Sequence, residues 1–168
     1  MKRLVFTFGT LYEDAIIEAL LGTIPQNFYA KLTGYSLYKG NFSQVPPKVK
    51  DFFDTTGVDQ NSFSYLFIKE DPHHNFVLDG RAYFIDLEQE LILDHWELYP
   101  DWNRKMVVTI TAEDGTTHEA FVYTQDIEGE RLEEFKRVVN NPEKVLTRAK
   151  AARKRAVDKF PEAFKKKE

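Results

Sequence analysis

Residues 3–11, Arg-Leu-Val-Phe-Thr-Phe-Gly-Thr-Leu, combine an apolar run that predicts a strand with a glycine at the end of that strand. The helical pattern from Tyr12 to Leu21 follows directly. A chain that passes through a glycine from a strand into a helix leaves backbone N–H groups without partners, and such groups can bind an anion. The N–H groups of Gly9, Thr10 and Leu11 are therefore candidate hydrogen-bond donors to a bound anion. In the purely structural alternative, the tight turn needs glycine only for its conformation.

A second segment, residues 86–100, predicts a helix with a carboxylate near its end. Asp86 and Gln89 have the spacing of a capping box, in which each side chain accepts a hydrogen bond from the backbone N–H of the other residue. Pro100 ends the helical pattern. Glu97 therefore falls in the last turn of this helix.

The position of Glu97 is unfavourable for a charged carboxylate. The helix macrodipole disfavours an anion in the last turn, and the neighbouring Trp96 and Leu98 are large and apolar. Desolvation and the dipole should both raise the pKa of this carboxyl group toward the range that suits a general acid or base. In the alternative interpretation, Glu97 forms a structural ion pair with Arg104 or Lys105, because such pairs also perturb pKa values.

The rest of the body predicts more strand than helix. Apolar and alternating runs bounded by turn residues predict strands near residues 28–38, 63–69, 76–85, 104–111 and 117–124. Asp114-Gly115 lies between the last two strands and is a strong hairpin signal. The first helix should end at Gly22, and its apolar face should be Ile16, Ile17, Leu20 and Leu21. We expect an α+β fold built on a small mixed sheet that is closed or half-closed.

In order along residues 4–124, these segments resemble the gamma-glutamylcyclotransferase family, including its AIG2-like branch. Phe8-Gly9-Thr10-Leu11 is similar to the family's YGTL loop, and residues 77–84 and 119–123 are similar to two of its strands. Leu93-Asp94-His95-Trp96-Glu97 is similar to its LDxxE segment. Tyr99-Pro100 with Arg104-Lys105 is similar to the stretch that follows this segment. Two positions depart from the family pattern. Phe8 replaces the usual tyrosine, and Leu98 follows the glutamate where the family often has glycine.

The resemblance implies a six-stranded β-barrel and an enzyme that forms 5-oxoproline. In that reaction the α-amine of a gamma-glutamyl amine or amino acid attacks the side-chain carbonyl and expels the attached amine. The resemblance assigns Glu97 as the catalytic acid/base and places six residues at the substrate, namely Phe8, Gly9, Thr10, Leu11, Arg104 and Tyr123. It implies no metal and no organic cofactor. The competing hypothesis is a non-catalytic AIG2-like domain that binds a small molecule in the same pocket.

The composition fits a small enzyme or binding domain. The 168 residues are enough for one domain that buries roughly two thirds of its unfolded surface. The chain has no cysteine, which excludes disulfides and thiol chemistry. The N-terminal apolar run is too short for a signal peptide or a membrane span, so we expect a cytoplasmic protein without a membrane partner. The sequence does not predict an oligomeric state.

The C-terminal segment differs from the body in charge. Residues 148–168 contain nine Lys or Arg and three Asp or Glu, a net charge of +6, whereas the whole chain carries −4. We therefore divide the chain into a body of residues 1–126 and a basic helical extension of residues 127–168, with a helix restart at Asn140-Asn141-Pro142. We expect the extension to be a solvated helix or one that lies against the acidic body or a neighbouring chain, and to add modest stability and no chemistry. Nucleic-acid binding is the less favoured alternative.

Overall fold

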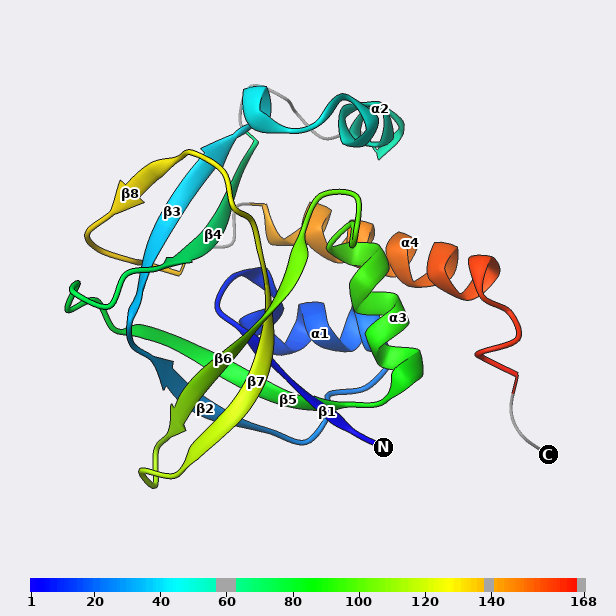
Figure 1. The fold of residues 1–168 in the computed structure, drawn as a ribbon. Helices are drawn as coiled ribbons and strands as arrows, with labels where there is room; N and C mark the ends of the chain where they lie inside the picture. Colours follow the sequence, from blue (N-terminus) through cyan, green and yellow to red (C-terminus); the bar gives the residue numbers. More distant parts are fainter. Residues whose placement is uncertain (57–62, 138–140, 166–168) are drawn as a thin grey trace.

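Five strands close a barrel at the centre of the computed structural model, which describes residues 1–56, 63–137 and 141–165. Their order around the barrel is β1-β5-β2-β6-β7 (Figure 1). The strands are β1 (Arg3–Thr7), β2 (Asn27–Leu32), β5 (Leu78–Ile85), β6 (Arg104–Ala112) and β7 (Thr117–Thr124). β1 and β7 run parallel, with Val5 opposite Phe121, and the other neighbouring pairs are antiparallel. The β1–β7 pair therefore brings the C-terminal ends of two strands to one end of the barrel.

A smaller sheet lies beside the barrel in the order β4-β3-β8. It consists of β3 (Tyr35–Asn41), β4 (Ser64–Glu70) and β8 (Glu130–Leu132), which appear together at the upper left of Figure 1. The segment predicted as one strand, residues 28–38, is divided between the two sheets because Gly34 turns the chain with φ of 83°. The α+β class and the curved sheet are thus confirmed. Within the described residues, five strands rather than six close the barrel.

The helices cover one side of the barrel strands. They are α1 (Asp14–Leu21), α3 (Leu87–Trp96) and α4 (Pro142–Lys159), with α4 running beside α1 and α3 (Figure 1). Because side chains alternate along a strand, Val5 and Phe121 pack against these helices, whereas Phe6 and Val122 pack on the opposite side with residues of β3 and β4. A fourth helix, α2 (Pro47–Thr56), follows a short 3-10 turn at Phe42–Gln44.

The local signals in the sequence are confirmed. The predicted apolar face of α1 is buried, and Gly22 ends this helix in the left-handed conformation with φ of 79°. Asp86 Oδ1 accepts from the N–H of Gln89 at 2.9 Å, and Gln89 Oε1 accepts from the N–H of Asp86 at 3.0 Å. This capping box fixes the start of α3 and therefore the position of Glu97, eleven residues after Asp86.

The C-terminal part is more integrated with the body than the sequence predicted. Residues 130–132, expected in a helical extension, instead form β8 and pair with β3, whose edge offers unpaired backbone groups. Asn141 caps α4 as predicted, while Asn140 lies outside the described residues. The α4 side chains that join the core with α1 and α3 are Val145, Ala149, Ala152 and Ala156. The boundary at residue 126 and the modest contribution of this segment to stability stay predictions, while these buried side chains place one face of α4 in the core.

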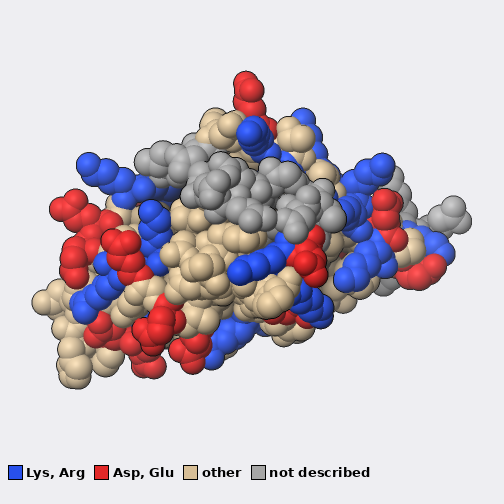
Figure 2. All heavy atoms as spheres, turned by 90° about the horizontal axis from the view of Figure 1, so that it is seen from above, with Lys and Arg blue, Asp and Glu red and all other residues tan. Residues whose placement is uncertain are grey.

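Some of the basic residues of α4 contact the helices on which α4 packs. Arg153 donates to the carbonyl of Leu20 at 3.2 Å, close to the C-terminus of α1, where a cation is favourable. The guanidinium of Arg148 lies 5.7 Å from the ring centre of Trp96 on α3. On the face shown in Figure 2, basic and acidic side chains are interspersed rather than segregated. Among the helices that the structure describes, none has the length and apolar character needed to cross a lipid bilayer.

We expect Ala152→Leu to destabilise the protein by about 1–3 kcal/mol, the typical cost of overpacking a filled core. Ala152 is 2% exposed and packs in the cluster formed with α1 and α3. The neighbouring Ala151 is exposed, so Ala151→Leu is a matched control that should leave stability nearly unchanged. Urea unfolding of the three proteins measures the difference. Equal stabilities would show that α4 does not belong to the cooperative core.

Candidate functional site

Glu97 occupies the residue directly after the last residue of α3. Its N–H donates to the carbonyl of Leu93 at 2.8 Å, which continues the helical pattern for one residue. The side-chain amide of Asn103 also binds Glu97. Asn103 Nδ2 donates to Glu97 Oε2 at 3.0 Å and to the Glu97 backbone carbonyl at 2.8 Å. The carboxylate is therefore fixed at the end of the helix, in agreement with its predicted position.

The environment of Glu97 raises the pKa of its carboxyl group to about 7, from an ordinary value of 4.5. Burial is the largest cause, because it disfavours the charged form, and the negative charge of Asp94 acts in the same direction. The hydrogen bond from Asn103 opposes both, since it stabilises the carboxylate. A carboxyl group with this pKa can both accept and release a proton near neutral pH.

The alternative in which Glu97 is the partner of Arg104 or Lys105 is not what the structure contains. Lys105 Nζ lies 2.6 Å from Glu90 Oε1 and 2.6 Å from Asp94 Oδ1. Arg104 is exposed and lies 3.9 Å from a carboxylate oxygen of Asp126. Within the described residues, Glu97 forms no ion pair. An ion pair with a cation would lower the pKa of this carboxyl group, so its raised pKa agrees with burial and not with a salt bridge.

A buried polar network surrounds the site. The carboxylate of Glu90 pairs with Arg3 as well as with Lys105. Asp94 Oδ1 also accepts a hydrogen bond of 2.6 Å from the hydroxyl of Tyr123. Burial and the nearby carboxylates raise the pKa of Tyr123, so it stays a hydrogen-bond donor. This network joins β1, α3, β6 and β7 and stiffens the wall next to Glu97.

Side chains of strand β5 donate hydrogen bonds to carbonyl groups of the loop after β1. The hydroxyl of Tyr83 donates to the carbonyl of Leu11 at 3.1 Å, and Arg81 donates to the carbonyl of Tyr12 at 3.2 Å. The N–H groups of Gly9, Thr10 and Leu11 donate to no acceptor within the described residues. A Cβ atom built on Gly9 would have no atom of the described residues within 4 Å. The loop thus presents unpaired donors and open space beside Gly9, as expected for a ligand-binding backbone.

The parallel pairing of β1 and β7 brings this loop and Glu97 to the same end of the barrel. Gln125 follows β7 directly, just as the loop follows β1. Gln125 Nε2 donates to Asn103 Oδ1 at 3.0 Å, and Asn103 donates to Glu97. The two segments singled out in the sequence therefore lie at one end of the fold, on either side of the last residues of β7.

The other predicted site residues differ in their placement. The Phe8 side chain is 6% exposed and packs near Phe6, with ring centres 6.5 Å apart, so its ring is part of the core. Leu11 is likewise buried, and Tyr123 binds Asp94. The Arg104 side chain points to Asp126 and is not brought to Glu97.

Asn103 and Gln125 contact the site but were missed in the sequence. Both are isolated polar residues next to strands, and such residues have no distinctive spacing. Leu98 departs from the family pattern in a way that the backbone explains. It has φ of 53°, in the left-handed region that glycine adopts without steric cost. Its side chain packs with Val45 and Val49, away from the strands of the barrel.

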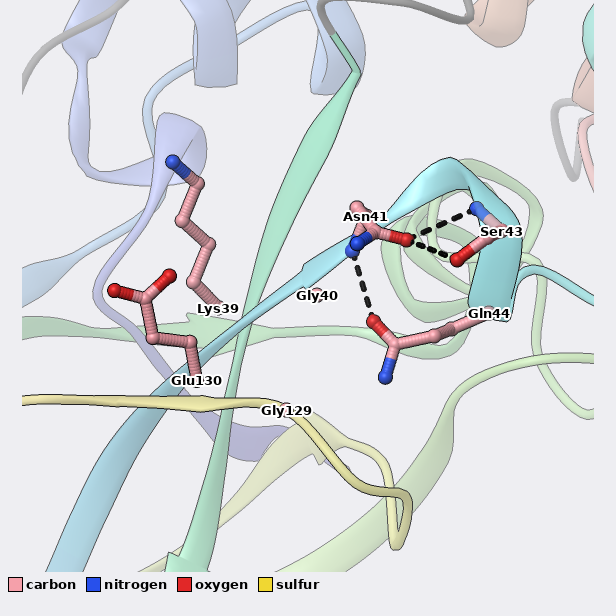
Figure 3. Close-up of a pocket in the computed structure, with 7 residues that line it drawn as sticks. All are labelled: Lys39, Gly40, Asn41, Ser43, Gln44, Gly129 and Glu130. Carbon is pink, nitrogen blue, oxygen red and sulfur yellow. Dashed lines mark hydrogen bonds between the residues drawn. The ribbon is translucent and has the colours of Figure 1, made fainter.

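Two hollows accompany these elements. A groove of about 510 Å³ lies beside Asp94 and Tyr99, between α2, α3 and the end of α4. A second, polar hollow of about 520 Å³ lies where β3 meets β8 and the 3-10 turn at Phe42–Gln44, and Figure 3 shows Asn41 bound to Ser43 and Gln44 there. These bonds cap the 3-10 turn. The first hollow adjoins α3 on the side of Asp94.

Comparisons with known proteins agree on one family. Residues 5–141 match the family described as gamma-glutamyl cyclotransferase, AIG2-like. No curated protein sequence matches the chain. A solved gamma-glutamyl cyclotransferase has a TM-score of 0.61 and 14% identity over 78% of this chain and 70% of its own. An uncharacterized protein from Homo sapiens has a TM-score of 0.59 and 15% identity over 77% of this chain and 69% of its own.

A protein from Arabidopsis thaliana is similar over a longer range. It has a TM-score of 0.55 and 16% identity over 99% of this chain and 94% of its own, so the match includes α4. At these identities the structural likeness concerns the fold.

Proposed function

Because the chain belongs to the gamma-glutamyl cyclotransferase, AIG2-like family, we propose that it is an enzyme that cyclises a gamma-glutamyl amine or amino acid to 5-oxoproline and releases the amine. The observation that carries this proposal is the half-buried Glu97, whose carboxyl group has its pKa raised to about 7, at the barrel end that also holds the loop of Gly9 to Leu11. The pairing suits an intramolecular acyl transfer, which needs a proton carrier and a group that stabilises negative charge.

Glu97 acts as the proton carrier in this mechanism. The neutral α-amine of the substrate attacks the γ-carbonyl carbon, and the carboxylate of Glu97 takes one proton from the attacking nitrogen. A carbon–nitrogen bond closes the five-membered ring. Glu97 then gives this proton to the leaving nitrogen as the original amide bond breaks, which regenerates the carboxylate. The tether already supplies proximity, so the protein must hold the folded conformer and move the proton.

The loop after β1 stabilises the charges of the substrate. The N–H groups of Gly9, Thr10 and Leu11 bind its carboxylate or the oxyanion that develops on the carbonyl oxygen. The hydrogen bonds of Tyr83 and Arg81 to the loop carbonyls support this arrangement because they orient the peptide groups before substrate binds. Preorganised donors need no rearrangement during the reaction.

The direct test is release of 5-oxoproline from a panel of gamma-glutamyl amino acids, dipeptides and amines. Turnover of one class identifies the leaving amine. Binding of 5-oxoproline without turnover of any substrate would assign the chain to the competing class, a non-catalytic binding domain. Neither binding nor turnover would contradict both hypotheses.

The activity should depend on pH through Glu97. We expect kcat/KM to rise as the pH increases through about 7, because Glu97 must be a carboxylate to accept the proton from the amine. An ordinary glutamate would give this inflection near pH 4.5. The measurement is the pH profile of kcat/KM with a substrate from the panel. An inflection at the ordinary value would mean that Glu97 is not the titrating base.

The raised pKa of Glu97 should also make the free energy of unfolding depend on pH in the absence of substrate. The folded state holds the proton of Glu97 more tightly than the unfolded state, so the contribution of this group is complete below pH 4.5 and is lost as the pH rises through about 7. Glu97→Gln removes this titration. The wild type should therefore lose more stability than the variant between these two pH values, as measured by urea unfolding.

A further inference from the structure

The side-chain amides of Asn103 and Gln125 form a chain of hydrogen bonds that ends at Glu97. The backbone carbonyl of Glu97 can only accept, and Asn103 Nδ2 donates to it at 2.8 Å and to the carboxylate at 3.0 Å. Asn103 therefore turns its NH2 group toward Glu97 and its oxygen toward Gln125. This oxygen in turn accepts from Gln125 Nε2 at 3.0 Å. The orientation of both amides follows from one group that cannot donate.

This chain leaves the carbonyl oxygen of Gln125 without a donor. Gln125 is 3% exposed, and its Oε1 atom is buried with no hydrogen-bond partner among the described residues. Buried amide oxygens are nearly always paired, so an exception calls for an explanation. The residue follows β7 at the barrel end where the loop after β1 presents its unpaired N–H groups. The unpaired acceptor thus belongs to a residue at the barrel end of the proposed site, linked to Glu97 through Asn103.

We propose that Gln125 binds the substrate through its Oε1 atom, which accepts a hydrogen bond from the attacking amine, and that Asn103 is a positioning residue for Gln125 and Glu97. This inference rests on the proposed function. The neutral amine has two N–H groups. One gives its proton to Glu97, and the other donates to Gln125, which directs the nitrogen lone pair toward the γ-carbonyl carbon. The ring nitrogen of the product keeps the second N–H, so the contact with Gln125 persists in the bound product.

Product binding tests the role of Gln125 without turnover. The probes are 5-oxoproline and its lactone analogue, in which a ring oxygen replaces the N–H group. We expect the wild type to bind the lactam about tenfold more tightly, the size of one hydrogen bond. Gln125→Met should abolish this preference because methionine offers no comparable acceptor. Gln26 is exposed, so Gln26→Met is a matched control that should keep the preference.

The outcomes separate this inference from the proposed function. A lactam preference that survives Gln125→Met would overturn the role of Gln125 while leaving the cyclotransferase assignment intact. Absence of 5-oxoproline binding and of turnover in the wild type would overturn both. Calorimetric titration gives the affinities, and a thermal melt of each variant shows whether it is folded.

Asn103→Ala provides a second readout that does not depend on whether Gln125→Met folds. The Asn103 hydrogen bond lowers the pKa of Glu97 against the raising effects of burial and Asp94. We therefore expect the acid-side inflection of kcat/KM to move above its wild-type position near pH 7 in this variant. A residue with only a structural role would reduce the amount of active protein without moving the inflection. An unchanged pH profile would overturn the positioning role of Asn103.

Discussion

Glu97→Gln is expected to lower kcat by about 100-fold or more, the usual contribution of a positioned general acid/base. Glutamine preserves the shape of the side chain and can still accept the hydrogen bond from Asn103. It cannot carry a proton between the attacking and the leaving nitrogen. The loss should therefore appear in kcat, with a smaller effect on KM, in an assay of 5-oxoproline release.

The control for this variant lies on the same helix. Glu88 is exposed in the first turn of α3, so Glu88→Gln removes a carboxylate of the same type without reaching the site. It should retain wild-type kinetics. Turnover of Glu97→Gln at the wild-type rate, with the fold verified by circular dichroism, would end the assignment of Glu97 as the acid/base.

Gly9→Val is expected to reduce kcat/KM by about 100-fold or more, at least the cost of losing one preorganised oxyanion donor. Its side chain would occupy the space beside the loop donors, where no atom of the part of the chain that the structure describes lies within 4 Å of the added Cβ atom. The backbone angles of Gly9 are φ −100° and ψ −135°, so a thermal melt of the variant must accompany the kinetics to show that it folds. Steady-state kinetics measure the loss of kcat/KM, and titration with 5-oxoproline measures the loss of ligand affinity.

Two comparisons isolate the effect of the added side chain. Thr10→Ser keeps the backbone donors and should change the kinetics only slightly. Gly80→Ala should instead impair folding, because its Cβ atom would lie 2.3 Å from the ring of Phe6 and 2.6 Å from the carbonyl of Thr7. If Gly9→Val retains wild-type affinity and turnover, the loop is a structural turn, and the simpler interpretation of the glycine is correct.

The elements predicted best are those whose signals lie within a few residues. The capping box at Asp86, the left-handed end of α1 at Gly22 and the hairpin at Gly115 all depend on hydrogen bonds or backbone angles of near neighbours. The apolar face of α1 was also read correctly, because helical periodicity determines which side can be buried. The sequence therefore specifies the position of Glu97 at the end of α3 and the turn after β1.

The arrangement of the strands could not be predicted from such local signals. One predicted strand became β2 and β3 in separate sheets, and a segment expected to be helical became β8. Strand pairing depends on residues far apart in the chain, as in the contact of β3 with β8. The burial of Ala149 and Ala152 in α4 depends likewise on α1 and α3, because small residues are buried only where a partner surface fits them.

By itself, the sequence determined that residues 8–11 form an unpaired donor loop after a strand and that Glu97 ends a capped helix. These are consequences of local backbone chemistry. The tertiary structure alone decided that Lys105 pairs with Glu90 and Asp94 rather than with Glu97, that Asn103 holds the carboxylate, and that Gln125 holds Asn103. The reason is physical: ion pairs and buried hydrogen bonds form between side chains that tertiary packing, here of α3 on the barrel, brings within about 3 Å, whatever their separation in the chain.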